Sequence, residues 1–416
     1  MTNQEQKETQ LPSSRIESID VVRGLTILVM IFVNDIAGVP DIPVWMKHMP
    51  TLSDGMTFVD LVFPAFLFIV GMAMPFSIGR RLEKGDDPWS TWKHIIIRIL
   101  GLLIIGFYMV NSDVISAQGI INPHLWIILM YVFVMIIWNK SNGTNRFLSK
   151  KWIKYIAIVG LVILAFLYRG ENQEGLMQMR THWWGILGLI GWAYLVACLI
   201  YIPFRKSQFA ILGGLVLLYC FYMADEAGLL SQFSSLNDFI HTSYTLGSHT
   251  AIILSGTLLG NMLQKNIGNS NHLYILKWSF GFSLSLFLAG LFLHELHEIH
   301  IMFIVSKNLG TVPWCLISSA FTIWIWMAVY WIMDMKGFRT WAIIIEPAGT
   351  NPLFAYILAP LVIECFSLLA YLFMGFNLYT WLGQSFYIGL FRAIFLAFSM
   401  TWLAGYLSRR GLQLKL

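Results

Sequence analysis

The chain has 416 residues, of which 57% are hydrophobic and only 12% are charged, and its mean hydropathy is +0.68. Soluble domains carry about a quarter charged residues, so this composition excludes an ordinary soluble enzyme and predicts a chain embedded in lipid. The net charge of +5 is small, and we expect no nucleic-acid partner.

Residues 1–19 are polar and contain no apolar segment typical of a cleaved signal peptide, so we expect a cytoplasmic tail there. Between residues 20 and 408, about twelve apolar runs reach the length of a membrane span, or about ten if the least apolar runs are discounted. They predict an all-α fold, a polytopic integral membrane helix bundle that forms a single transmembrane domain, with a second cytoplasmic tail at residues 409–416. The runs are centred near Val29, Phe68, Leu103, Tyr131, Val159, Gly191, Val216, Ile253, Leu286, Ile323, Tyr356 and Ala397.

Basic residues alternate between loops along the chain. Most of the 27 Lys and Arg residues lie in the two tails and in every second loop. Cytoplasmic loops of membrane proteins carry an excess of Lys and Arg, so we predict that both termini are cytoplasmic and that the loop containing His48 lies outside. The outer loops hold only a few basic residues, namely Lys47, Arg169, Arg180 and Lys307.

Polar residues interrupt the first predicted hairpin, residues 20–81, where a passive anchor would have none. A helix rises 1.5 Å per residue and must cross about 30 Å, so Asn34 and Asp35 are predicted in the outer half of the first span. Prolines restrict the following loop and keep His48 near the outer mouth of the bundle. Asp60 begins the second span, where it is placed to orient His48 or Lys47, or to cap the helix. Polar groups at membrane depth are costly and are candidates for function.

The same hairpin carries a dense motif. It reads Asp20-x-x-Arg23-Gly24, then Val33-Asn34, then Lys47-His48, then Thr57-x-x-Asp60-Leu61-Val62-Phe63-Pro64-x-Phe66-x-Phe68-Ile69-x-Gly71. It resembles the transmembrane N-acetyltransferases of the heparan-α-glucosaminide type. Two later stretches, residues 185–188 and 349–353, are similar to landmarks of that family. The run that starts at His182 resembles the sequence pattern of a bacterial branch of the family. We therefore expect the protein in a bacterial cytoplasmic (inner) membrane.

The resemblance implies transfer of an acetyl group from cytoplasmic acetyl-CoA to the amine of a terminal glucosamine on the outer side. It gives His48 the role of catalytic residue and places Asn34 beside the acetyl group. Histidine suits removal of a proton from an amine near neutral pH, and a carboxamide can donate to the oxyanion that forms on the acetyl carbonyl. The residues leave open whether His48 acts as a base or first carries the acetyl group, and whether the acceptor is an amine or a sugar hydroxyl.

Coenzyme A carries phosphates, which Arg and Lys bind well. The candidates on the cytoplasmic side are Arg98, which has a counterpart in the family segment, with Arg80, Arg81, Lys93 and Arg23. On the outer side Arg180 and His182 are candidates for the substrate, as is Asn351 from the later landmark.

Further polar residues lie at depth in the later spans. They could line a tunnel, but we favour helix packing and mutual pairing for each, for example Glu364 with Arg392. The run from His294 to His300 has its histidines three residues apart rather than in HExxH spacing, and we expect no metal site. The four cysteines lie in apolar runs and predict neither disulfides nor zinc ligands.

A secondary transporter is the leading alternative, because about twelve spans with both ends inside is common among transporters. The chain shows no half-to-half repeat and no matched pair of broken helices, which argues against a transporter. A structural role in a membrane complex is a third reading, and the polar hairpin argues against it. The aromatic-rich surface that faces lipid is compatible with a homodimer.

Overall fold

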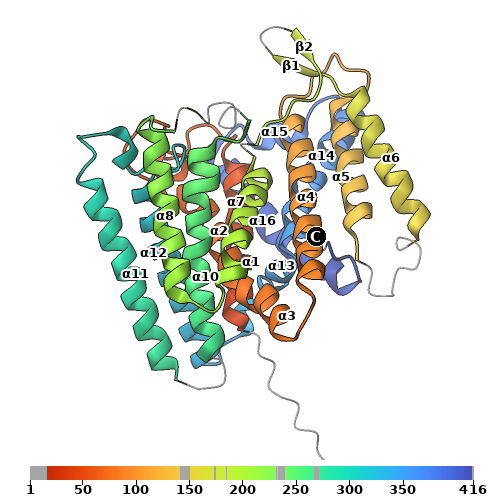
Figure 1. Ribbon diagram of the computed structural model, residues 1–416. Helices are drawn as coiled ribbons and strands as arrows, with labels where there is room; N and C mark the ends of the chain where they lie inside the picture. Colours follow the sequence, from red (N-terminus) through yellow and green to blue (C-terminus); the bar gives the residue numbers. More distant parts are fainter. Residues whose placement is uncertain are drawn as a thin grey trace, which may run out of the picture.

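Long helices make up almost all of the regular structure in the computed structural model, which describes residues 16–140, 150–172, 175–183, 185–230, 232, 239–266 and 271–414. The two described strands, β1 (Gly170–Asn172) and β2 (Gly175–Met177), pair antiparallel with Gly170 opposite Met177. They project from the top of the molecule in Figure 1. The predicted all-α class is therefore confirmed, with one small hairpin that the sequence did not predict.

Each predicted apolar run has its centre inside a helix. Short helices α3 (Arg80–Glu83), α13 (Glu346–Thr350) and α15 (Leu378–Leu382) lie between the long ones. The long helices are α1 (Glu17–Ile36), α2 (Val62–Met74), α4 (Pro88–Ser112), α5 (Pro123–Trp138), α6 (Lys151–Leu167), α7 (Ile186–Phe204), α8 (Gln208–Glu226), α10 (His249–Asn266), α11 (His272–His294), α12 (Val312–Tyr330), α14 (Pro352–Met374) and α16 (Phe386–Arg409).

Within the described residues, eight helices are long and apolar enough to cross a membrane. They are α4, α7, α8, α11, α14, α16, α12 with its extension to Met335, and α2 with the turns that flank it (Phe58–Glu83). Helix α5 is apolar but shorter, and α1 carries charged residues at both ends. The count of about twelve spans and the side of each terminus stay predictions.

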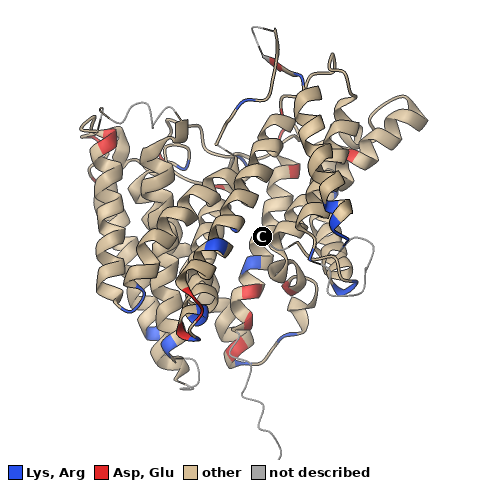
Figure 2. Ribbon diagram, turned by 45° about the vertical axis from the view of Figure 1, so that its right-hand side comes forward, with Lys and Arg blue, Asp and Glu red and all other residues tan. Residues whose placement is uncertain are grey.

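The helices stand roughly side by side in one bundle (Figure 1). Helices α8, α10, α11 and α12 form its left part, α4, α5, α6 and α14 its right part, and α1, α2, α7 and α16 lie between them. Lys and Arg gather toward the lower end, where α1 begins (Figure 2). The upper end, where α1 stops, has few of them, as the alternation of basic loops predicts.

Two close helix contacts fix the elements that carry the polar hairpin. A Cβ atom at Gly256 of α10 would lie 1.9 Å from the carbonyl oxygen of Phe68 on α2, so the two backbones touch. Near the start of α1, a Cβ at Gly349 of α13 would lie 1.7 Å from the carbonyl oxygen of Asp20. Small residues permit such contacts between membrane helices, and here they hold α1 and α2 in register with their neighbours.

Candidate active site

His48 and Asp60 form a hydrogen-bonded pair at the upper end of the bundle. The Nδ1 atom of His48 lies 2.7 Å from Oδ1 of Asp60, whose residue is only 1% exposed. The other oxygen, Oδ2, accepts from the backbone N–H groups of Thr57 at 3.1 Å and Met49 at 3.3 Å. A carboxylate only accepts, so Nδ1 of His48 carries a proton, and in the neutral imidazole the lone pair is on Nε2.

The turn that begins the second span explains the position of Asp60. Thr57 is the N-cap of the 3₁₀ turn Phe58–Leu61, and Asp60 occupies the third position of a reciprocal capping box. The Thr57 hydroxyl also donates to the carbonyl of Lys47 at 2.8 Å, which ties the His48 segment to the turn. Because a carboxylate has two oxygens, Asp60 both caps the turn and binds His48, so the two predicted roles occur together.

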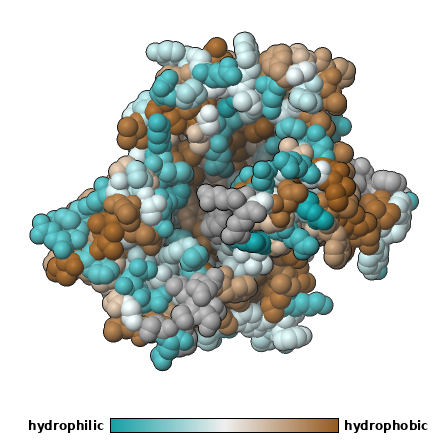
Figure 3. Space-filling model, turned by 90° about the horizontal axis from the view of Figure 1, so that it is seen from above, coloured by the Kyte–Doolittle hydropathy of each residue, from teal (hydrophilic) through white to brown (hydrophobic). Residues whose placement is uncertain are grey.

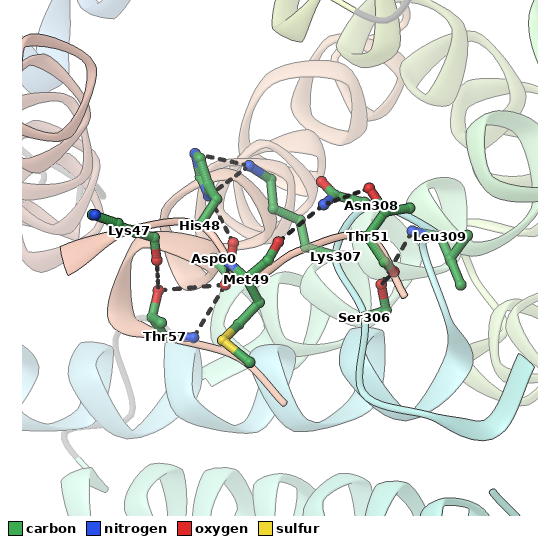
Figure 4. A network of polar contacts seen from close by, with 10 residues as sticks. All are labelled: Lys47, His48, Met49, Thr51, Thr57, Asp60, Ser306, Lys307, Asn308 and Leu309. Carbon is green, nitrogen blue, oxygen red and sulfur yellow. Dashed lines mark hydrogen bonds and ion pairs between the residues drawn. The ribbon is translucent and has the colours of Figure 1, made fainter. Parts of the chain in front are cut away.

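Lys307, from the loop before α12, completes this cluster (Figure 4). Its Nζ atom lies 3.2 Å from Nδ1 and 3.3 Å from Nε2 of His48. Burial lowers the pKa of the Lys307 ammonium, while the nearby Asp60 carboxylate opposes that shift. His48 therefore stands between a carboxylate and an amine, and sequence reasoning did not find the amine.

Several bonds join the His48 loop to the Lys307 loop. Asp54 accepts from the Val305 N–H at 2.8 Å and pairs with His294 at 2.7 Å. Asn308 donates to the carbonyl of Met49 at 3.1 Å (Figure 4). Burial raises the pKa of Asp54, but these hydrogen bonds outweigh it and hold that pKa below its ordinary value. The two loops thus form one rigid rim around His48.

A cavity of about 900 Å³ opens beside this rim. Asn34, at the exposed end of α1, lines it, and so does Lys307. Its other walls come from α2, α4, α5, α7, α10, α14, α15 and α16. The face seen from above in Figure 3 is hollowed, with hydrophilic residues around the hollow. Asn34 and His48 are therefore linked to one cavity, His48 through its contact with Lys307.

A buried ion pair holds one wall of this cavity. Arg392 on α16 donates from Nε to Oδ2 of Asp35 at 3.1 Å and from Nη1 to the carbonyl of Tyr379 at 2.7 Å. The Tyr379 hydroxyl donates to the other oxygen of Asp35. Burial and the Asp35 carboxylate raise the pKa of Tyr379. This cluster fixes the end of α1 directly beside Asn34.

The opposite wall holds further acidic groups. Glu364 on α14 pairs with Nδ1 of His124 at 2.6 Å, so the predicted pairing of Glu364 with Arg392 is wrong. Arg392 lies instead against Asp35, since α16 packs along α1. Asp113, just past α4, also lines the cavity, and burial raises the pKa of its carboxyl.

The predicted coenzyme A residues lie away from this cavity, and none of them is among its lining residues. Arg98 on α4 stacks on Tyr194, with the guanidinium carbon 4.9 Å from the ring centroid. Arg80 stacks on Phe76 at 5.3 Å, while Arg81 and Lys93 are exposed. Arg23 binds Asp20 and the carbonyl of Gly349, both at 2.9 Å, which gives it a packing role.

The predicted substrate residues are dispersed. Arg180 and His182 are exposed just before α7, and the backbone of Arg180 is held by the side chain of Asn111. Asn351 is buried just before α14. Its side-chain amide donates to the hydroxyl of Ser408, near the end of α16, at 3.0 Å. None of the three lines the 900 Å³ cavity. No metal-binding group of His, Cys, Asp or Glu occurs among the residues that the structure describes.

Together these features define a polytopic helical membrane protein with a polar cavity and a histidine–carboxylate pair at one end. The chain belongs to the family described as "Domain of unknown function (DUF5009)", which matches residues 15–263. It is also similar to heparan-alpha-glucosaminide N-acetyltransferase of Mus musculus, with 35% identity over 110 residues, and to that of Homo sapiens, with 34% over 100 residues. These matches cover 26% and 24% of this chain.

The chain spans only 16% and 14% of the length of the two relatives that it matches. The similarity supports a distant relationship to these membrane acetyltransferases, in agreement with the resemblance carried by the hairpin motif.

Proposed function

We propose that this protein is a membrane acetyltransferase that moves the acetyl group of acetyl-CoA to the amine of a glucosamine-type sugar. The observation that carries the proposal is the buried Asp60 carboxylate on Nδ1 of His48, 2.7 Å away, with His48 in contact with Lys307, which lines the same cavity as Asn34. The partial similarity to N-acetyltransferases supports the reaction class.

His48 acts as the general base in this proposal. Asp60 holds the proton on Nδ1, so Nε2 takes a proton from the acceptor amine. The amine nitrogen attacks the thioester carbon, the new C–N bond forms, the C–S bond breaks, and the leaving CoA thiolate takes up the proton that His48 had accepted. The Asn34 amide donates to the oxygen that becomes negative during this step. In a two-step route Nε2 of His48 would itself carry the acetyl group, and a trapped acetyl-imidazole would identify that route.

We further propose that acetyl-CoA enters from the cytoplasm. Arg98, Arg80, Arg81 and Lys93 would bind its phosphates at the lower end, while the pantetheine arm reaches toward Asn34. Both termini would then be cytoplasmic, with residues 20–408 as one transmembrane domain between the tails at 1–19 and 409–416, in a bacterial inner membrane. Arg180 and His182, which are exposed, stay candidates for the acceptor, whereas the buried Asn351 has a packing role against Ser408.

Transfer of labelled acetyl from acetyl-CoA to glucosamine by the purified protein in nanodiscs tests the proposal. We expect transfer by the wild type and loss of at least about 10²-fold in His48→Gln, the range for a general base. His272→Gln is the control, because His272 bonds the Tyr330 hydroxyl at 2.8 Å and belongs to neither loop of the rim around His48. Equal activity in His48→Gln and wild type would refute the site. Solute uptake into proteoliposomes without CoA release would indicate a transporter instead.

A further inference from the structure

His249, the first residue of α10, has no hydrogen-bond partner in the described part of the chain. Its residue is only 3% exposed, and both ring nitrogens are buried and unpaired. Yet it lines the 900 Å³ cavity together with Asn34 and Lys307. Buried polar atoms are nearly always hydrogen-bonded, and an exception in a cavity wall calls for a partner. A ligand bound in the cavity would supply such a partner.

The surroundings of His249 are aromatic. Its ring centroid lies 5.1 Å from that of Phe63, 5.6 Å from Tyr244 and 6.1 Å from Trp314. No carboxylate is bonded to it among the described residues. A neutral imidazole offers one N–H donor and one acceptor, and the Trp314 indole N–H beside it is a second buried donor without a partner, so this corner sets N–H donors among aromatic rings.

His249 lies close to the His48–Asp60 pair. Phe63 follows Asp60 by three residues, which is about one helical turn. His249 packs edge-on against Phe63, so it lies about one turn deeper in the bundle than the His48–Asp60 pair. A group bound at His249 would therefore lie below an acceptor that approaches His48 from outside.

We propose that this corner is the acetyl subsite, where the N–H of His249 donates to the acetyl carbonyl oxygen while Phe63 and Tyr244 enclose the methyl group. An acetyl group has one carbonyl oxygen, which accepts from N–H donors, and one apolar methyl, which suits an aromatic wall. A sugar has several hydroxyls and would leave most of them unpaired here. The oxygen becomes negative when the amine attacks, so a fixed donor there favours the transition state.

This inference rests on the proposed acetyl transfer, and two variants test it separately. His249→Phe keeps a ring of similar size but removes both nitrogens. Because loss of one oxyanion donor costs about 10²–10³ in kcat, we expect such a loss with the KM for glucosamine unchanged. His249→Gln, which restores an N–H donor, should recover part of the rate. His272→Phe is the control, since His272 bonds the Tyr330 hydroxyl at the start of α11.

Acyl-group preference gives a readout that does not require an intact His249. Phe63→Ala enlarges the proposed methyl pocket, and each methylene in such a pocket changes selectivity by about 10–200-fold. We expect the ratio of kcat/KM for propionyl-CoA to that for acetyl-CoA to rise at least about tenfold. This ratio decides the inference if His249→Phe fails to fold.

The outcomes separate the two proposals. If the wild type transfers no acetyl group at all, the proposed function fails and the subsite fails with it. If the wild type is active but His249→Phe retains its kcat within twofold, or Phe63→Ala leaves the acyl preference unchanged, the acetyl subsite is refuted while the proposed function stands.

Discussion

The substitution Asp60→Asn tests the catalytic pair with almost no change in shape. In the wild type, Oδ1 accepts from His48 and Oδ2 accepts from two backbone N–H groups, those of Thr57 and Met49. An amide has one oxygen and one NH₂ group, so it cannot accept from both sides. The question is which side keeps the oxygen.

The number of backbone N–H donors decides which way the introduced amide faces. If the amide oxygen faces His48, the NH₂ group faces two buried backbone donors, and each orphaned donor costs about 1–3 kcal/mol. If the oxygen faces the backbone, both of those bonds survive, and the NH₂ group donates to Nδ1 of His48. The second arrangement is favoured by about 2–6 kcal/mol, so the amide introduced by Asp60→Asn should force the proton of His48 onto Nε2.

This inverted tautomer removes the lone pair that the proposed base needs. The same exchange in a Ser-His-Asp triad loses about 10⁴ in kcat because the tautomer is wrong, and general bases contribute about 10²–10⁴. We therefore expect Asp60→Asn to lower kcat by about 10²–10⁴-fold. The melting temperature should fall only slightly, since both backbone bonds of the capping turn are kept.

Acetyl transfer by purified variants, with thermal unfolding measured in parallel, checks both expectations. Asp87→Asn is the control, because Asp87 also caps a helix, accepting from the Ser90 N–H at the start of α4, but belongs to neither the His48 loop nor the Lys307 loop. An Asp60→Asn enzyme whose kcat stays within threefold of the wild type would refute the tautomer argument.

Three further predictions concern stability. Gly256→Ala should lower the melting temperature because its Cβ would meet the α2 backbone at 1.9 Å, whereas Gly213→Ala, with nothing within 4 Å, should leave it unchanged or slightly higher. The pKa of Asp54 lies below its ordinary value in the folded protein, so its contribution to stability is present above about pH 4 and is lost as the pH falls through the folded pKa. Protease cleavage of its loop should increase in that acid range, and less so in Asp54→Asn. Asp35→Asn and Arg392→Met should each destabilise by about 3–5 kcal/mol, and a double variant that loses the sum of both effects would contradict the pairing.

The helices could be predicted because lipid leaves few alternatives. Backbone groups at membrane depth must bond within their own segment, so an apolar run of sufficient length becomes a helix, and every predicted centre lies in one. The short helices α13 and α15 and the hairpin of β1 and β2 escaped prediction. They lie between the apolar runs, where contacts with distant segments decide the conformation, as Gly349 of α13 against α1 illustrates.

The site could be predicted only where its parts are close in sequence. His48 and Asp60 lie on one hairpin, and a pairing between them was one of the predicted alternatives. Lys307 lies 259 residues from His48, and no periodicity relates the two. One signal was available: Lys307 is one of the few basic residues in the outer loops, which needs an explanation under the positive-inside rule. Glu364 was assigned the wrong partner because sequence does not show which helix faces α14.

The contacts of Lys307 leave the proposed base accessible. Its Nζ atom is within 3.3 Å of both ring nitrogens of His48. The lone pair of Nε2 points in the ring plane away from Nδ1, so an atom on that axis would lie much farther from Nδ1 than from Nε2. Lys307 therefore lies beside the ring and does not occupy the position from which an acceptor amine would give its proton to Nε2.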